Sequence, residues 1–132
     1  MDKKIIENIK KTLDASLPKQ ATAMLYGSQA RGDARQESDW DILIVLDKDR
    51  LTPEDYDTIT YPLTKLGWDM GAEINPIMYT KKEWEASRIT PFYHNVIEDA
   101  IALWVWMTKR ELSTIVEPAH ELVKVIAELI QQ

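Results

Sequence analysis

The chain has 132 residues, of which 45% are apolar, enough for one compact domain over residues 1–132 and too many for wholesale disorder. It has no cysteine, which excludes disulfides, thiol nucleophiles and thiolate zinc sites. A net charge of −6 disfavours a polynucleotide ligand. The sequence has no 18-residue apolar run and no apolar amino terminus, so we expect a soluble, cytoplasmic protein that is neither secreted nor inserted in a membrane.

The amino-terminal part of the chain predicts a helix followed by a strand. Lys3–Ser16 repeats apolar residues at helical spacing, which gives one apolar face, and Pro18 ends the helix. Ala21–Tyr26 is a short apolar run that favours a strand, and Gly27 follows it. We therefore expect the strand to stop at Gly27.

The next segment predicts one turn of helix, a loop and a second strand. Ser28–Arg31 has the composition of a helix start, with Ser28 as its cap, and residues 32–38 are polar. Trp40–Leu46 is the strongest strand pattern in the chain, because it is apolar on both faces after Asp41. That pattern is typical of a central strand that is covered on both sides.

Residues 53–66 are expected to form a helix. Thr52 stands in the place of its cap, Pro53 is at the first position, and two acidic residues follow in the first turn. Pro62 predicts a kink or a break in this helix, since proline removes a backbone donor. Residues 67–71 begin and end with glycine and are expected to form a turn.

A third strand and two short helices are expected after this turn. Residues 72–79 predict the strand, in which Pro76 indicates an irregularity or an edge position. Residues 80–83 resemble a capping box that opens a short helix ending at about residue 87. Residues 91–100 predict another helix.

Residues 101–132 are expected to be a carboxy-terminal extension, helical at its end. Residues 101–107 fit a strand and a continued helix equally well. Residues 109–131 have a helical pattern that Pro118 interrupts, and the apolar face of their second half suits a partner protein, a second copy or this chain's own sheet. The order of elements predicts an α+β fold, a small mixed sheet flanked by helices.

Two carboxylates lie at the start of the predicted central strand. Asp39 and Asp41 are two residues apart, so their side chains point to the same side of a strand. Like charges this close repel, and one of the two holds its proton unless a cation intervenes. Carboxylate oxygens suit Mg²⁺ and Mn²⁺. A solvated acidic strand end is the alternative, because this short pattern is not specific alone.

Gly27 and Ser28 form the second part of a candidate site. A glycine between a strand and a helix start lets a ligand approach the backbone, and the amide groups of the first helical turn attract anions. Arg31 falls in the same turn, where its charge opposes the helix dipole and a bound phosphate would offset that cost. The alternative is an ordinary turn with an exposed arginine.

The two parts together resemble a known family. Gly-Ser, ten residues and then Asp-Trp-Asp, over residues 27–41, resembles the signature of the DNA polymerase beta-like nucleotidyltransferase superfamily. Ala30-Arg31-Gly32 and Ser38 stand where the minimal bacterial and archaeal nucleotidyltransferases carry them. The resemblance covers about residues 1–100, the family core, and implies the polymerase-beta-like nucleotidyltransferase fold.

The resemblance implies a metal site with three carboxylates. Asp39 and Asp41 are expected to be catalytic and to bind two Mg²⁺ ions, for which Mn²⁺ can substitute. Glu73 is expected to be the third catalytic and metal-binding carboxylate, although many members of the family have aspartate there. Asn75 shares the face of Glu73 on the predicted strand and is the alternative ligand.

The implied reaction is metal-dependent nucleotidyl transfer. Gly27, Ser28 and Arg31 are expected to bind the triphosphate of a nucleoside triphosphate, ATP in the first instance, while an acceptor hydroxyl attacks the α-phosphate and pyrophosphate leaves. Minimal members of the family are often antitoxins of a helical, HEPN-type toxin, to which they attach AMP. A homodimer is an alternative assembly, and an inactive or weakly active partner-binding module of the same fold is the alternative function.

Other polar residues are weaker candidates. His94 could contact a nucleotide, but a surface or capping histidine is the expected interpretation. Lys65, Lys81 and Lys82 could bind phosphate, but solvated lysines are expected. Trp40, between the two aspartates, is expected to point into the opposite, packed face of the sheet.

Overall fold

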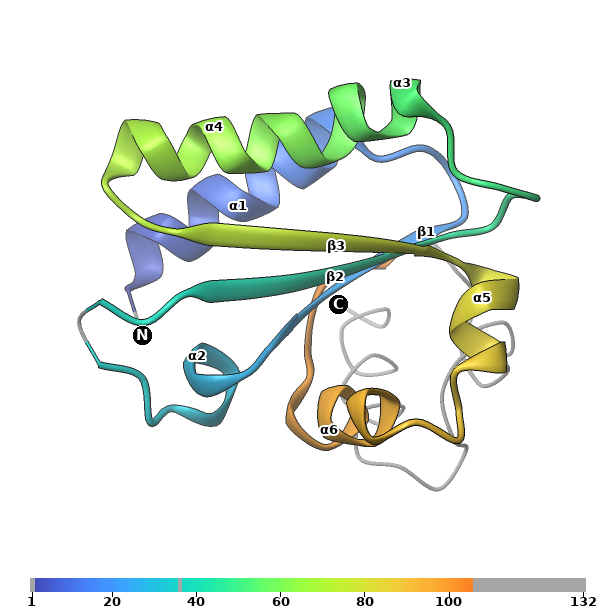
Figure 1. Ribbon diagram of the computed structural model, residues 1–132. Helices are drawn as coiled ribbons and strands as arrows, with labels where there is room; N and C mark the ends of the chain where they lie inside the picture. Colours follow the sequence, from blue (N-terminus) through green and yellow to red (C-terminus); the bar gives the residue numbers. More distant parts are fainter. Residues whose placement is uncertain (1, 36, 106–132) are drawn as a thin grey trace.

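The computed structural model describes residues 2–35 and 37–105, which form a four-stranded sheet with helices on both faces (Figure 1). The strands are β1 (Ala21–Tyr26), β2 (Trp40–Leu46), β3 (Ile74–Thr80) and β4 (Ile101–Val105). They lie in the order β3-β2-β1-β4, in which β1 pairs antiparallel with β2 and β4, and β3 pairs parallel with β2. The sheet is mixed, so the predicted α+β fold is confirmed.

Two helices cover one face of the sheet. α1 (Lys3–Ser16) and α4 (Tyr61–Met70) lie side by side over it, as Figure 1 shows. Asp2 begins α1 by accepting a hydrogen bond from the backbone N–H of Lys4 at 2.9 Å. The core between these helices and the sheet includes Ile9, Leu13, Leu25, Trp40, Ile42, Ile44, Leu63 and Met78.

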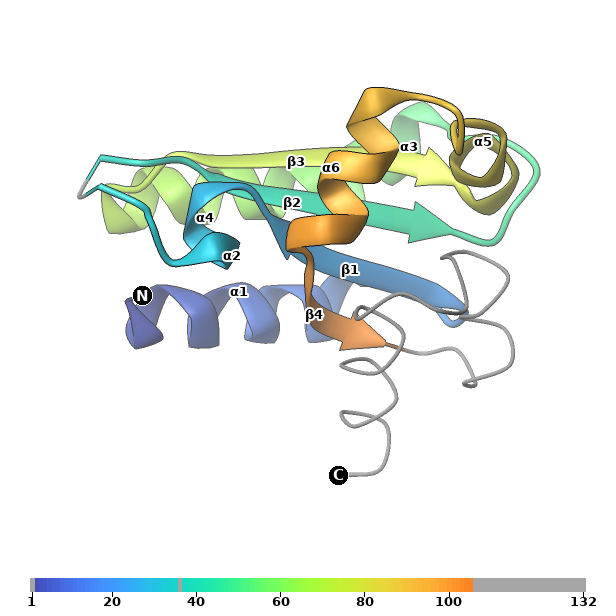
Figure 2. The ribbon, with the colours of Figure 1, turned by 90° about the horizontal axis from the view of Figure 1, so that it is seen from below.

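Three helices lie on the other face of the sheet. They are α2 (Ser28–Arg31), α5 (Lys81–Ala86) and α6 (Pro91–Asp99), and α6 crosses the strands in the view of Figure 2. The core on this side includes Met24, Leu43, Val45, Trp84, Tyr93, Val96 and Ile97. β2 is therefore buried on both faces, as predicted. Trp40, which is 3% exposed, packs towards α1 and α4, so Asp39 and Asp41 face α2 and α6.

The helix expected over residues 53–66 is present, but its course differs from the prediction. It begins as α3 (Pro53–Asp55) behind the cap Thr52, continues through a π-helical turn, η1 (Tyr56–Thr60), and becomes α4. The helix is not broken at Pro62, and the irregularity in it is this π turn, which changes the hydrogen-bond register just before the proline.

The predicted turn over residues 67–71 is wrong, because α4 continues through Gly67 and ends at Met70. Gly67 is buried where the chain folds back beneath the helix, and a Cβ atom there would lie 2.5 Å from the carbonyl oxygen of Ala72. Its glycine is needed for a close approach between helix and strand. The helix ends at Gly71, which has φ 67°.

The third strand starts at Ile74, two residues later than predicted, and lies at the edge of the sheet, as Pro76 indicates. Its register with β2 is regular, and Pro76 pairs with Ile42. The capping box at the start of α5 is confirmed. Glu83 accepts from the backbone N–H of Thr80 at 2.8 Å, and Thr80 Oγ1 accepts from that of Glu83 at 3.1 Å.

Of the two interpretations left open for residues 101–107, the strand is confirmed over the described part, since Ile101–Val105 is β4 and pairs with β1. The helix expected over residues 109–131, with Pro118 and the apolar face, lies outside the described residues. Within residues 2–35 and 37–105, the helices are too short or too polar to span a bilayer.

Candidate active site

The predicted site residues gather where β1 ends and β2 begins, on the side of the sheet that faces α2 and α6. Tyr26, the last residue of β1, pairs with Asp41 in β2. The chain leaves β1 at Gly27 and enters α2 at Ser28, so the turn after β1 lies against the first residues of β2. Sheet pairing thus explains why a motif split by ten residues forms one site.

Gly27 is in direct contact with one of the two carboxylates. Its φ is 78°, a conformation that side chains with a Cβ rarely adopt, and a Cβ atom there would lie 2.5 Å from Oδ2 of Asp41. Gly27 also occupies the capping position of α2, so the prediction that Ser28 is the cap is wrong. The turn from strand to helix needs a positive φ at this position, which moves Ser28 into the helix.

The start of β3 brings two more polar residues to the carboxylate pair. Asn75 is in register with Asp41, and its Nδ2 donates to Oδ2 of Asp39 at 3.0 Å. The carbonyl oxygen of Glu73 accepts from the backbone N–H of Trp40 at 2.8 Å, which holds Glu73 beside Asp39 although its side chain is exposed. The structure therefore brings together Asp39, Asp41, Glu73 and Asn75.

Two acids of this group, Asp41 and Glu73, have raised pKa values. Burial raises the pKa of Asp41, as does the charge of Asp39, and these effects exceed the opposing ones of the neighbouring Asn75 amide and the Arg31 charge. The charge of Asp39 raises the pKa of Glu73, and a hydrogen bond between these two side chains raises it further. Acids this close together form a region of negative potential, which a bound cation would neutralise.

The donor chemistry of this group fits a divalent cation that prefers oxygen ligands. Asp39 and Asp41 leave the strand on the same side, with the carboxylate of Glu73 and the amide oxygen of Asn75 next to them. Within the described ranges, no three histidine or acidic side chains already converge as a ligand cluster. Asn75 contacts Asp39 directly and Glu73 lies at the rim, so both remain candidates for the third ligand.

Arg31 lies at the end of α2 and is held by two acids. Its Nε donates to Asp33 at 3.1 Å and its Nη1 donates to Asp99 at 2.8 Å, and these two hydrogen bonds raise the pKa of the guanidinium group. Asp99 comes from α6, 68 residues away in the sequence. Sequence reasoning missed Asp99, because no local pattern indicates a contact at that separation.

A cavity of about 500 Å³ opens beside Gly27 and Arg31, between the end of β1 and α6. Burial, and then the charges of Asp41 and Tyr79, raise the pKa of Tyr26 at its wall to about 12, so the phenol stays protonated at neutral pH. The lining residues are Tyr26, Gly27, Arg31, Phe92, Asn95, Val96, Glu98 and Asp99. The prediction that His94 is a surface histidine is confirmed, since it is exposed, whereas no sequence pattern indicates Asn95 beside it.

Gln29 supports the loop before the carboxylates, a role that the sequence did not indicate. Its side chain, 6% exposed, donates from Nε2 to the carbonyl oxygen of Ser38 at 3.2 Å. Ser38 in turn accepts from the backbone N–H of Arg35 at 2.7 Å through Oγ. These bonds fix the chain just ahead of Asp39.

The lysines considered from the sequence lie away from this group. Lys81 and Lys82 line a different cavity, together with Asp47 and Asp49 beyond the far end of β2. Lys65 is exposed on α4, which covers the opposite face of the sheet. Their positions agree with the expectation that these lysines are solvated and do not bind the phosphates.

Comparison with known sequences relates most of the chain to one family. The family model described as polymerase beta, nucleotidyltransferase, matches residues 7–101. A protein of Methanocaldococcus jannaschii, provisionally named a protein adenylyltransferase, is 37% identical over 81 residues, which are 61% of this chain and 75% of that protein.

Solved structures share the fold at low sequence identity. A chain of a toxin–antitoxin crystal structure with AMP-PNP superposes with a TM-score of 0.59 and 21% identity, covering 96% of this chain and 87% of that one. A chain of the toxin–antitoxin MntA–HepT gives a TM-score of 0.56 and 18% identity, covering 98% and 88%. At these identities the likeness shows the fold alone.

Proposed function

Because the chain belongs to the polymerase beta nucleotidyltransferase family, it is a nucleotidyltransferase, and we propose that it transfers AMP from ATP to an acceptor hydroxyl with the help of a divalent cation. The observation that carries this proposal is the contact between the two halves of the site, since a Cβ at Gly27 would lie 2.5 Å from Oδ2 of Asp41. A triphosphate on the turn would thus have its α-phosphate beside the carboxylates, where transfer needs it.

The carboxylate side of the site binds the metal in this proposal. Asp39 and Asp41 would hold two Mg²⁺ ions, or Mn²⁺ in their place, and Glu73 or Asn75 would supply the third protein ligand. Bound metal neutralises the triphosphate and stabilises the attacking and leaving oxygens. The raised pKa values of Asp41 and Glu73 support this assignment, because the acids lack a compensating charge of their own.

The residues of the chain bind the donor and move the proton. The backbone at Gly27 and Ser28 and the Arg31 guanidinium bind the triphosphate. The acceptor oxygen forms a bond to the α-phosphorus while the bond to the β-phosphate oxygen breaks, and pyrophosphate leaves. Glu73 accepts the hydroxyl proton, a role that its raised pKa and exposed position favour.

The acceptor that we propose is a hydroxyl on a partner protein of the HEPN type, with this chain as the antitoxin of a toxin–antitoxin pair in the cytoplasm. Two comparisons support a protein acceptor. The Methanocaldococcus jannaschii relative is provisionally named a protein adenylyltransferase, and the similar solved structures are toxin–antitoxin complexes, one of them with AMP-PNP.

The test is to incubate the protein with α-labelled ATP, Mg²⁺ and the product of the neighbouring gene. We expect label on the partner, and loss of labelling when EDTA removes the metal. A complex that forms without any label on the partner would favour the alternative of a partner-binding module. No binding of Mg²⁺–ATP at millimolar concentration would point to the same alternative.

A further inference from the structure

The arginine of the proposed phosphate site does not point freely into solvent. Arg31 uses Nε to donate to Asp33 and Nη1 to donate to Asp99, at 3.1 and 2.8 Å. A guanidinium group has five N–H donors in a fixed plane, so these two bonds fix its orientation and leave three donors for another ligand. The position of the arginine is therefore set by its acidic partners.

The two partners differ in how firmly the fold holds them. The side chain of Asp33 is 63% exposed in a loop, whereas that of Asp99 is 15% exposed at the last residue of α6. Residues Tyr93, Val96 and Ile97 bury the same helix in the core. Asp99 is thus anchored on a packed element, and Asp33 is not.

The place of Asp99 in its helix is unfavourable by itself. An acid in the last turn of a helix lies at the negative end of the helix dipole, which disfavours its charge. The ion pair with Arg31 across the gap between α2 and α6 offsets that cost. Asp99 is thus unfavourable for its own helix, and its partner Arg31 lies at the candidate site. This combination indicates a function for Asp99 other than stabilising the helix.

The ion pair also lies at the right place for the proposed donor. Arg31, Asp99 and Gly27 line the same cavity of about 500 Å³. The guanidinium group thus lies beside the turn that we propose binds the triphosphate.

We propose that Asp99 is a positioning residue, which fixes the guanidinium group of Arg31 so that its remaining N–H groups meet the phosphates of the nucleoside triphosphate. This inference rests on the proposed function. It assigns a role to α6, an element that carries none of the family motif.

The first test measures kcat and KM for Mg²⁺–ATP, and the Kd of a non-hydrolysable ATP analogue, in the wild type and in D99N. We expect KM and Kd to rise about 3- to 10-fold, with kcat changed less than twofold. D99E, which keeps the charge, should recover most of the affinity. D33N should have a smaller effect than D99N, since Asp33 is exposed and less firmly held.

The matched control is D69N, which removes an exposed acid from the last turn of α4 on the other face of the sheet. It should leave KM unchanged. Thermal unfolding of each variant shows whether it is folded at the assay temperature.

A double-mutant cycle separates positioning from a general structural role. In R31A, adding D99N should raise KM no further, because Asp99 acts through Arg31. An equal rise with and without Arg31 would overturn the inference, as would an unchanged or a tighter affinity in D99N. Tighter binding would mean that Asp99 only neutralises the arginine. A wild type that neither binds nor transfers AMP would overturn the proposed function as well.

Discussion

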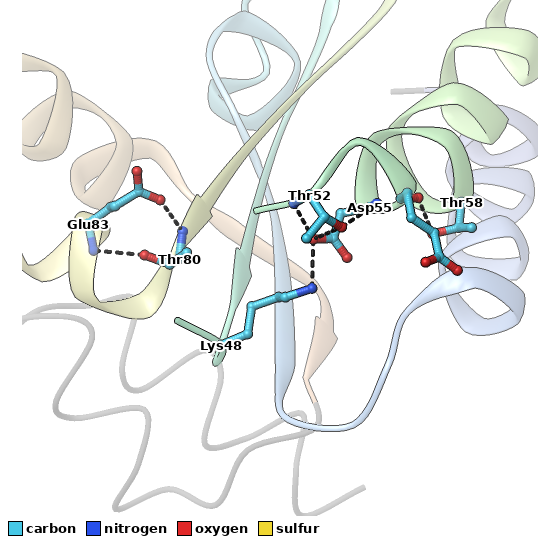
Figure 3. A network of polar contacts seen from close by, with 7 residues as sticks. Lys48, Thr52, Asp55, Thr58, Thr80 and Glu83 are labelled. Atoms are coloured by element: carbon cyan, nitrogen blue, oxygen red, sulfur yellow. Dashed lines mark hydrogen bonds and ion pairs between the residues drawn. The ribbon is translucent and has the colours of Figure 1, made fainter. Parts of the chain in front are cut away.

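The pKa values of acidic side chains are shifted in opposite directions at the two ends of β2. At its start, burial and the charge of Asp39 raise the pKa of Asp41. Beyond its end, Asp55 accepts hydrogen bonds from Lys48 Nζ at 2.7 Å and from the backbone N–H of Thr52 at 2.8 Å (Figure 3). Burial raises the pKa of Asp55, but these bonds more than reverse that effect and the pKa lies below its ordinary value.

The difference separates acids that stabilise the fold from acids that are available to a ligand. The polar groups at the far end satisfy one another, as the Thr80–Glu83 capping box in Figure 3 also does. At the near end, Asp39 has an amide donor from Asn75, whereas burial and the charge of Asp39 raise the pKa of Asp41, and the charge of Asp39 raises that of Glu73. We therefore expect substitutions at the start of β2 to change activity more than stability. Substitutions beyond its far end should change stability more than activity.

The largest effect is expected from D39N and D41N, which keep the shape of the side chain and remove its charge. Each should lower AMP transfer by about a thousandfold or more, because the proposed metal site loses a ligand. D47N, an exposed acid beyond the other end of the same strand, is the matched control and should transfer AMP at the wild-type rate. Initial rates with labelled ATP measure both, and wild-type rates in D39N and D41N would contradict the assignment.

The second prediction compares two glycines with positive φ at the ends of α2. G27A should lose about 1–3 kcal/mol of stability and most of its activity, since the added methyl group would meet Asp41 Oδ2 at 2.5 Å. At Gly32 a Cβ would have no neighbour within 4 Å, so G32A should lose only about 1 kcal/mol and keep its activity. Urea unfolding and transfer assays on both variants check this, and equal losses of activity would refute the contact.

These two predictions concern residues that the sequence already indicated. Helical periodicity predicted α1, and the run of apolar residues over Trp40–Leu46 predicted β2. A helix that is buried on one face and a strand that is buried on both faces each leave a pattern of apolar residues in the sequence. The resemblance of residues 27–41 to a family signature predicted one site, and the pairing of β1 with β2 is the physical reason.

Features that depend on contacts distant in sequence were not predictable in this way. Gly67 looks like a turn residue, and only the crowding against Ala72 explains a glycine inside the helix. The ion pair of Arg31 with Asp99 and the bond from buried Gln29 to the loop have no periodic pattern. The metal-binding and catalytic roles of the site residues remain predictions.

At the far end of β2, D55N should lower stability by about 1–2 kcal/mol at neutral pH, because the hydrogen bonds from Lys48 and Thr52 lose their charged acceptor. The native pKa of Asp55 lies below the ordinary 3.8, so its contribution is complete above that pH and is lost as the pH falls through the native pKa. Unfolding free energies of wild type and D55N should therefore converge in acid. A difference that stays constant with pH would contradict this origin.

The smallest effect, of the opposite sign, is expected from D41N. The native pKa of Asp41 lies above the ordinary 3.8, so the native state is destabilised as the pH rises through the native pKa. Without metal, D41N should be more stable than the wild type at neutral pH by less than about 1 kcal/mol, as the half-exposed group is screened by solvent. The gain should disappear below pH 3.8, and a stability loss at neutral pH would show that the charge stabilises the fold.

The most direct test of the central claim, that Gly27 and the two aspartates form one metal-dependent nucleotide site, is a Mn²⁺ titration followed by electron paramagnetic resonance. With a non-hydrolysable ATP analogue present, the wild type should bind two Mn²⁺ ions per chain, and the D39N/D41N double variant should bind none at that site. The same Mn²⁺ binding in the double variant as in the wild type would contradict the claim.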